Sequence, residues 1–204
     1  MSLSAKPVSR LKPLPADHVS ELKESFRIYV KALGFVPNSV LIMQRKPKLV
    51  KALAQLAAAV WDPQSEVPLG FKRLVAHVAS KAHGCLYCMA HTAGASLRLG
   101  IDEKKLESVW EYRTSALFDE RERVALDFAI AAASQPNEVT DELFDQMKLY
   151  WTEGQIVEIA GVVAMFGFMN RWNDTMATPL EAEPIEVGEK HLAAHGWSVG
   201  KHAG

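Results

Sequence analysis

The long apolar segment from Thr152 to about Asn173 most constrains how this chain can fold. Its apolar residues recur at helical spacing and leave little polar surface, which predicts a helix that other elements surround. The chain has 204 residues, 49% of them hydrophobic and 23% charged, and this is the composition of one soluble globular domain with a sizeable core. We therefore expect a single domain built around this helix.

Most of the remaining sequence also follows the helical period, and Gly, Pro and capping residues separate the segments. No segment alternates with period two for long enough to predict a strand, and no glycine-rich phosphate loop is present. The sequence thus predicts an all-α, single-domain helical bundle of about eight helices over residues 17–180. An N-terminal extension, residues 1–16, precedes it, and a C-terminal tail with weak periodicity, residues 181–204, follows it. Besides the helix at 152–173, the predicted helices cover residues 17–32 (with Asp17 as the cap), 39–44, 47–61, 68–83, 85–99, 102–110, 119–133 and 140–150.

The balance of charge excludes several classes of protein. Lys and Arg number 23 and Asp and Glu number 24, for a net charge of -1, so the basic surface that nucleic-acid binding needs is missing. No apolar run is long enough to span a membrane, and the first residues lack the apolar core of a secretory signal. We expect a cytoplasmic protein with no nucleic-acid or membrane partner. Without a nucleotide-binding loop, we also expect no flavin or nicotinamide cofactor.

The two cysteines of the chain, Cys85 and Cys88, lie three residues apart. A disulfide across so short a loop would constrain the unfolded chain very little, so chemistry explains the pair better than stability does. On a helix, Cys85, Cys88 and His91 share one face. The break at Gly84 places Cys85 near the helix start, where the helix dipole favours an anion. The helix N-terminus and His91 are therefore expected to lower the thiol pKa, and His91 to accept or return the proton.

Two thiols beside a histidine suit a peroxidase cycle. The thiolate attacks a peroxide and becomes a sulfenic acid, and the second thiol then condenses with it to a disulfide. Such a cycle needs a small hydroperoxide as substrate and a thiol reductant or reductase protein as partner. The segment thus predicts catalytic roles for Cys85, Cys88 and His91.

Three other interpretations of the cysteine pair remain open. The pair can serve as a non-catalytic redox switch or disulfide-exchange site, or it can be two small buried hydrophobic residues. With His91 and His83 the two cysteines can also form a zinc site, although ligands this close along one helix converge poorly on a tetrahedral metal. We therefore predict no metal at these residues.

Residues 84–92, with the sequence GCLYCMAHT, resemble the carboxymuconolactone decarboxylase-like superfamily and, within it, the alkylhydroperoxidase D-like, peroxidase-related proteins. The stretches at residues 34–39 and 166–172 support this resemblance. It spans roughly residues 30–180, and its specific part is the cysteine pair followed by the histidine.

The resemblance implies an alkylhydroperoxidase D-like, all-helical fold that assembles into homo-oligomers. It also implies that the cysteine pair reduces hydroperoxides and is restored by a thiol reductant. By this resemblance Cys88 attacks the peroxide, Cys85 resolves the product and His91 relays the proton. Because the decarboxylase members lack the cysteine pair, its presence here argues against lactone decarboxylation.

The chain departs from these relatives at two positions. His91 follows the second cysteine by three residues, where many relatives have four, and both spacings keep the histidine on the same helical face. Relatives with a full proton relay carry a Glu twelve residues before the first cysteine, and Arg73 occupies that position here. We predict Arg73 to be a surface or salt-bridge residue, with assistance to thiolate formation as the alternative. The relay acid is then unassigned, with Glu66, His77 and His83 as alternatives by proximity.

Overall fold

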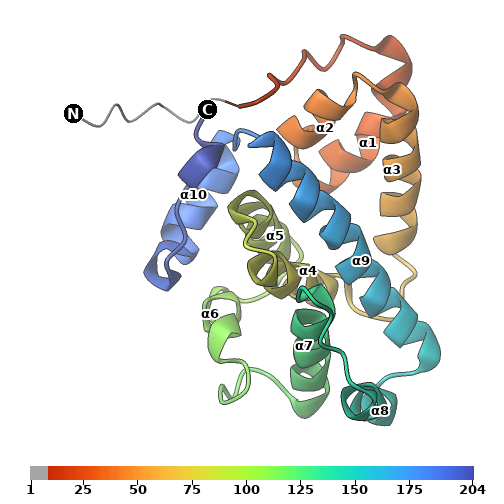
Figure 1. Ribbon diagram of the computed structural model, residues 1–204, viewed down its shortest axis with the longest axis vertical. Helices are drawn as coiled ribbons and strands as arrows, with labels where there is room; N and C mark the ends of the chain where they lie inside the picture. The colour runs from red at the N-terminus through yellow and green to blue at the C-terminus, as the bar shows by residue number, and fades with distance from the viewer. Residues whose placement is uncertain (1–8) are drawn as a thin grey trace.

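The computed structural model describes residues 9–204, and this part of the chain is all-helical, with no strand (Figure 1). The predicted fold class is thereby confirmed, with ten α-helices among these residues where about eight were expected. The helices are α1 (Lys23–Leu33), α2 (Asn38–Met43), α3 (Pro47–Val60), α4 (Leu69–Ala82), α5 (Leu86–Arg98), α6 (Glu103–Glu107), α7 (Glu120–Ala133), α8 (Asp141–Tyr150), α9 (Glu153–Met176) and α10 (Ala182–His191).

The long helix α9 runs through the molecule, as its apolar sequence predicts (Figure 1). It packs against α3, α4, α5, α7 and α8. Ile159 and Val162 on α9 have no exposed surface, and burying one such side chain typically stabilises a fold by about 1.5–3 kcal/mol. Within residues 9–204 no helix, α9 included, combines the length and the apolar character that crossing a bilayer needs.

Helices α4 and α5 pack closely against each other and against α9, and these three form the centre of the fold. Helices α1 to α3 cover one side of this centre, and α6 to α8 gather at its lower end in the view of Figure 1. Helix α10 packs on α5 at the left of the same view. The central trio is therefore covered from several sides, which sets the surroundings of every side chain on α4 and α5.

Side-chain caps determine where several helices begin. The side chains of Asp119 and Thr152 accept backbone N–H groups of Glu122 and Gln155, whose own side chains bond back to the cap residues, so α7 and α9 both start with a capping box. Thr140 caps α8 in the simpler way. Each such cap is typically worth about 1 kcal/mol. The predicted starts of these three helices are confirmed.

The start of the helical domain differs from the prediction. Asp17 caps no helix, because it lies inside a turn, and α1 begins only at Lys23 after a short 3-10 segment. The side chain of Gln44, at the end of α2, donates to the carbonyl oxygens of two consecutive residues of the N-terminal extension, at 3.2 and 3.0 Å. This part of the extension is thus held against the helices. Residues 1–8 of the predicted extension lie outside the described residues.

Residues 181–204, predicted as a tail, fold onto the helical domain. They contain α10, which packs on α5, and the indole N–H of Trp197 donates to the carbonyl oxygen of Leu86 at 2.9 Å. The Trp197 ring lies so close to α10 that a Cβ on Gly188 would be 2.4 Å from its Cη2. The sequence predicts no helix here because Pro184 and Gly188 interrupt the apolar pattern of a short segment.

Candidate active site

The two cysteines lie at the N-terminus of α5. Gly84 adopts a φ of 71°, a left-handed conformation that favours glycine, and it separates α4 from α5. Cys85 is the N-cap of α5, and its Sγ accepts a hydrogen bond from the backbone N–H of Cys88 at 3.4 Å. Both thiols are free and buried. The predicted position of Cys85 at the helix start is confirmed, and it sets the two thiols one turn apart.

A mostly apolar cavity of about 80 Å³ lies beside Cys88, and we refer to it as the thiol cavity. Cys88 and His91 both line it, whereas Cys85 does not. By this measure a single water needs roughly 10–15 Å³, so the cavity has room for a small molecule. Of the two thiols, Cys88 is therefore the one in the wall of this cavity. The other lining residues are Ile28, Tyr29, Ala32, Leu33, Pro37, Ser39, Val40, Leu53, Ala57, Trp61, Arg73, Tyr87, Thr92, Met165, Phe166, Met169 and Asn173.

The surroundings of Cys88 favour a neutral thiol in the resting protein. Burial raises the pKa of the Cys88 thiol well above its ordinary value, and the neighbouring Cys85 raises it further. The hydrogen bond that Asn173 Nδ2 donates to Cys88 Sγ, at 3.4 Å, acts in the opposite direction. The prediction that the helix N-terminus and His91 lower the thiol pKa is therefore wrong for Cys88, because burial is the largest influence on this thiol and raises its pKa.

His91 lies between two oxygen acceptors. Its Nδ1 is 3.0 Å from the carbonyl oxygen of Tyr87, and its Nε2 is 2.9 Å from Oε2 of Glu181. The second contact has the distance of an ion pair without the alignment of a linear hydrogen bond. Both nitrogens direct a proton toward an acceptor only when the ring is an imidazolium. The ring also stacks on that of Tyr87, with centroids 4.2 Å apart, which restricts its orientation.

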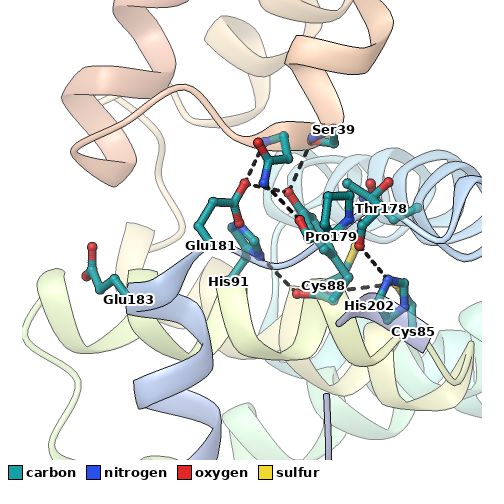
Figure 2. A network of polar contacts seen from close by, with 12 residues as sticks. Ser39, Cys85, Cys88, His91, Thr178, Pro179, Glu181, Glu183 and His202 are labelled. Atoms are coloured by element: carbon teal, nitrogen blue, oxygen red, sulfur yellow. Dashed lines mark hydrogen bonds and ion pairs between the residues drawn. The ribbon is translucent and has the colours of Figure 1, made fainter. Parts of the chain in front are cut away.

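Glu181 supplies a carboxylate beside the predicted histidine, and Figure 2 shows the two side chains together. Its Oε1 accepts hydrogen bonds from the Tyr87 hydroxyl, at 3.0 Å, and from the backbone N–H of Asn38. Burial alone would raise the pKa of Glu181, but the facing His91 and the backbone donors outweigh it, so this pKa lies below its ordinary value. The sequence does not reveal Glu181 because it belongs to the predicted tail, far from His91 along the chain.

The three residues predicted as alternatives for the relay acid lie outside the thiol cavity. His77 is buried with its Nδ1 2.9 Å from Thr92 Oγ1, and burial lowers its pKa to about 3. Glu66 accepts a hydrogen bond at the start of α9, and His83 lies in a separate groove beside the same helix. None of these three residues lines the thiol cavity.

Arg73 is buried in the wall of the thiol cavity, with 8% of its surface exposed. No ion pair of Arg73 is found within residues 9–204, so the predicted surface or salt-bridge role is wrong. The reason is the position of α4, which packs against α5, α7 and α9. Every residue from Phe71 to Ser80 is buried, so a polar side chain in this stretch has little access to solvent.

The cysteines and histidines weighed as zinc ligands do not gather within metal-binding distance in the described residues. The grouping of possible ligands found there is Glu103, Glu107 and His191, whose ligand atoms lie within 4.8 Å of one another. It joins α6 to α10, where His191 Nδ1 is 2.9 Å from Glu107 Oε1, and it has no residue in common with the thiol cavity.

Comparison with known proteins assigns this arrangement to a family. The sequence profile of the carboxymuconolactone decarboxylase family matches residues 47–131, which contain α3 to α6 and most of α7. The crystal structure of the debrominase Bmp8 is 33% identical in sequence and superposes with a TM-score of 0.83 over 88% of this chain and 96% of that one. The chain belongs to the carboxymuconolactone decarboxylase-like superfamily.

A further solved structure shares the fold, and a curated protein shares part of the sequence. The alkylhydroperoxidase AhpD core of an uncharacterized peroxidase-related protein from Ralstonia eutropha JMP134 is 23% identical, with a TM-score of 0.74 over 88% of this chain and 96% of that one. The expected alkylhydroperoxidase D-like fold is thereby confirmed. The uncharacterized protein YnjA of Escherichia coli (strain K12) is 27% identical over 97 residues, which are 48% of this chain and 53% of YnjA. This chain thus matches about half the length of that relative.

Proposed function

We propose that this chain is a thiol-dependent peroxidase in which Cys88 and Cys85 pass through a dithiol/disulfide cycle and His91 relays the proton. The observation that carries the proposal is the thiol cavity, which has Cys88 and His91 in its wall, while Cys85 caps the helix one turn behind. Membership of a superfamily with peroxidase-related proteins and the likeness to a debrominase over most of the chain both indicate an enzyme.

The cycle begins when Cys88 attacks the terminal oxygen of a small hydroperoxide in the thiol cavity. The S–O bond forms as the O–O bond breaks, the departing alkoxide takes a proton from the His91 imidazolium, and the thiol proton of Cys88 returns to the ring. The products are an alcohol and a sulfenic acid on Cys88. Cys85 then attacks that sulfur, water leaves, and a disulfide forms. A thiol reductant or reductase protein supplies the two electrons and two protons that restore both thiols.

Glu181 and Tyr87 act in this proposal as positioning residues for His91. The carboxylate stabilises the positive charge of the imidazolium, and the stacked ring and carbonyl oxygen of Tyr87 restrict how the imidazole turns. Because burial keeps Cys88 protonated at rest, the reaction depends on moving its proton, and His91 shares the cavity wall in which that transfer must occur.

A second candidate function is reductive dehalogenation. One related structure is a cysteine-to-alanine variant of the debrominase Bmp8 in complex with 2,3,4-tribromopyrrole, and its sequence is 33% identical to this chain. Trp61 and Phe166 give the thiol cavity aromatic walls, which suit a halogenated aromatic ring. A halogenated arene and two thiols yield the dehalogenated arene, a hydrogen halide and a disulfide. Dehalogenation therefore consumes the two electrons of the dithiol, as peroxide reduction does.

The partners of this enzyme are part of the proposal. We propose a small-molecule thiol or a reductase protein as the electron donor, which fits the reducing cytoplasm that we expect as its location. We also propose a homo-oligomer, as the resemblance implies. Leu149 and Val157 support it, because these two apolar side chains on neighbouring helices are 71% and 70% exposed.

Rapid-mixing kinetics of the reduced protein with hydrogen peroxide, cumene hydroperoxide and 2,3,4-tribromopyrrole test the proposal. We expect fast loss of a hydroperoxide and an intramolecular disulfide in the mass spectrum. Cys88→Ser should abolish the reaction, and Cys85→Ser should allow one turnover and leave a sulfenic acid that dimedone traps. His91→Gln should slow the reaction by about a hundred- to ten-thousandfold. The matched variant His83→Gln, outside the thiol cavity, should not.

The outcomes separate the candidate functions. If the wild-type protein consumes hydroperoxides no faster than free cysteine does, the peroxidase proposal is wrong. Debromination of the pyrrole under the same conditions would then establish the second candidate. Reversible disulfide formation without turnover of either substrate would leave the redox switch or disulfide exchange as the role of the pair.

A further inference from the structure

Among residues 9–204, Arg73 is the only lysine, arginine or acidic residue that lines the thiol cavity. It extends from α4, and its guanidinium carbon lies 3.6 Å from the ring centroid of Trp61, another lining residue. Cys88 and His91 line the same space. A buried cation and a nucleophilic thiol thus share one small apolar cavity.

The guanidinium of Arg73 has no acceptor within residues 9–204. No hydrogen bond from it is found there, and its buried Nε has no partner. The preceding residues 1–8 contain no acid at all. An arginine carries five N–H donors, and charges in protein interiors are normally paired. The face of the Trp61 ring offsets part of the cost of burial through a cation–π contact, but a ring face accepts none of the in-plane N–H groups, for which residues 9–204 offer no hydrogen-bond acceptor.

Two other cationic side chains of this protein do have side-chain acceptors. Lys72 precedes Arg73 in the sequence and is as deeply buried, and its Nζ lies 2.9 Å from Oε2 of Glu158. Arg121 also lies over a tryptophan ring, at 3.7 Å from the centroid. Its Nη2 donates to Oε1 of Gln155 at 2.9 Å, although its Nε, like that of Arg73, has no partner within residues 9–204. The fold therefore supplies acceptors to comparable cations, and Arg73 differs in facing the thiol cavity.

Arg73 keeps its charge in this environment. Burial lowers its pKa to about 10, with the positive charge of Arg98 as a second cause, and this value is still well above neutral pH. An anion in the cavity would meet a full positive charge in a medium of low dielectric constant, where the attraction is much stronger than in water. The cavity therefore favours a ligand that carries a negative group.

We propose that Arg73 binds an anionic group of the substrate, so that the site takes a small, otherwise apolar organic anion such as a carboxylate. The inference rests on the proposed function, because one molecule must reach both Arg73 and Cys88. A guanidinium pairs with a planar two-oxygen acceptor through two parallel hydrogen bonds. The apolar walls disfavour strongly hydrated inorganic anions. The anionic end then docks at Arg73 and directs the electrophilic atom toward Cys88.

Protection of Cys88 from alkylation tests this inference without turnover. The protein carries Cys85→Ser, so Cys88 is the one thiol that the neutral reagent iodoacetamide can modify. Acetate is compared with acetamide and benzoate with benzamide, at constant ionic strength, so that each pair is matched in shape and two sizes are covered. We expect at least one acid to protect Cys88 at concentrations about tenfold lower than its amide. Arg73→Gln should remove this difference and Arg73→Lys should keep part of it, while Arg121→Gln serves as the control.

Equal protection by acid and amide in both pairs would overturn the inference, whether or not the Arg73 variants fold. An unchanged preference for the acid in folded Arg73→Gln protein would overturn it as well. The experiments distinguish failure of the anion site from failure of the proposed function. Protection through Arg73 without reduction of any hydroperoxide or bromopyrrole would refute the proposed function alone. Turnover of neutral hydroperoxides without a preference for the acid would refute the anion site alone.

Discussion

Replacing Glu181 by glutamine removes the charge beside His91 and keeps the shape of the side chain. The amide oxygen can still accept from the Tyr87 hydroxyl and from the Asn38 N–H, so the main loss is the ion pair, whose atoms are 2.9 Å apart. For unit charges at 2.9 Å, Coulomb's law with an effective dielectric constant of about 20 gives roughly 6 kcal/mol, and desolvation offsets most of it. We expect Glu181→Gln to lower the free energy of unfolding by about 1–2 kcal/mol. Glu181→Ala, which also removes the acceptor, should lower it by about 3 kcal/mol.

The same contact predicts how stability depends on pH. The pKa of Glu181 in the folded protein lies below its ordinary value of 4.5, so the ionised carboxylate favours the folded state. That contribution is fully present above the ordinary value and is lost as the pH falls through the lower, folded-state pKa. The difference in unfolding free energy between the wild type and Glu181→Gln should therefore be present at about pH 6 and shrink steadily below about pH 4.5.

Urea denaturation followed by tryptophan fluorescence, at one protein concentration and several pH values, measures these differences. Glu183→Gln is the matched control, because Glu183 pairs with Arg98 and its side chain is 49% exposed. Exposed pairs are typically worth less than about 1 kcal/mol, so the control should change little. The reasoning is refuted if Glu181→Gln is as stable as the wild type at about pH 6, or if its deficit persists unchanged at low pH.

Two further predictions concern the packing of α10 and the environment of the thiol. Gly188→Ala brings a Cβ to 2.4 Å from Trp197, so α10 or the Trp197 ring must shift, and urea denaturation should show a loss of about 2 kcal/mol or more. At Gly161 on α9, an added Cβ meets no atom within 4 Å from the other described segments, so Gly161→Ala should instead gain about 0.5–1 kcal/mol. Equal effects of the two changes would contradict the packing described here. Asn173→Leu removes the hydrogen bond to Cys88 Sγ, so the pKa of this thiol rises further. The pH profile of the Cys88 alkylation rate with iodoacetamide should then move to higher pH. An unshifted profile would contradict the role given to that hydrogen bond.

Local signals in the sequence were sufficient for most of the fold. The starts of α7, α8 and α9 follow from caps at Asp119, Thr140 and Thr152, because a cap bonds to N–H groups within the next three residues. The break at Gly84 and the start of α5 at Cys85 are equally local. The three-residue spacing of the thiols and the histidine on α5 needs nothing beyond helical geometry.

The surroundings of these residues depend on tertiary packing. Glu181 reaches His91 only because α10 and its flanking residues pack on α5, and no periodicity along the chain connects the two. Arg73 is buried because α4 is covered by its neighbours, although its residue type is typical of the surface. Burial likewise raises the pKa of Cys88, where the helix position alone predicted a lower one. The spacing of residues determines which side chains share a helical face, but the energy of a charge depends on the segments that enclose it, and those come together only in the folded molecule.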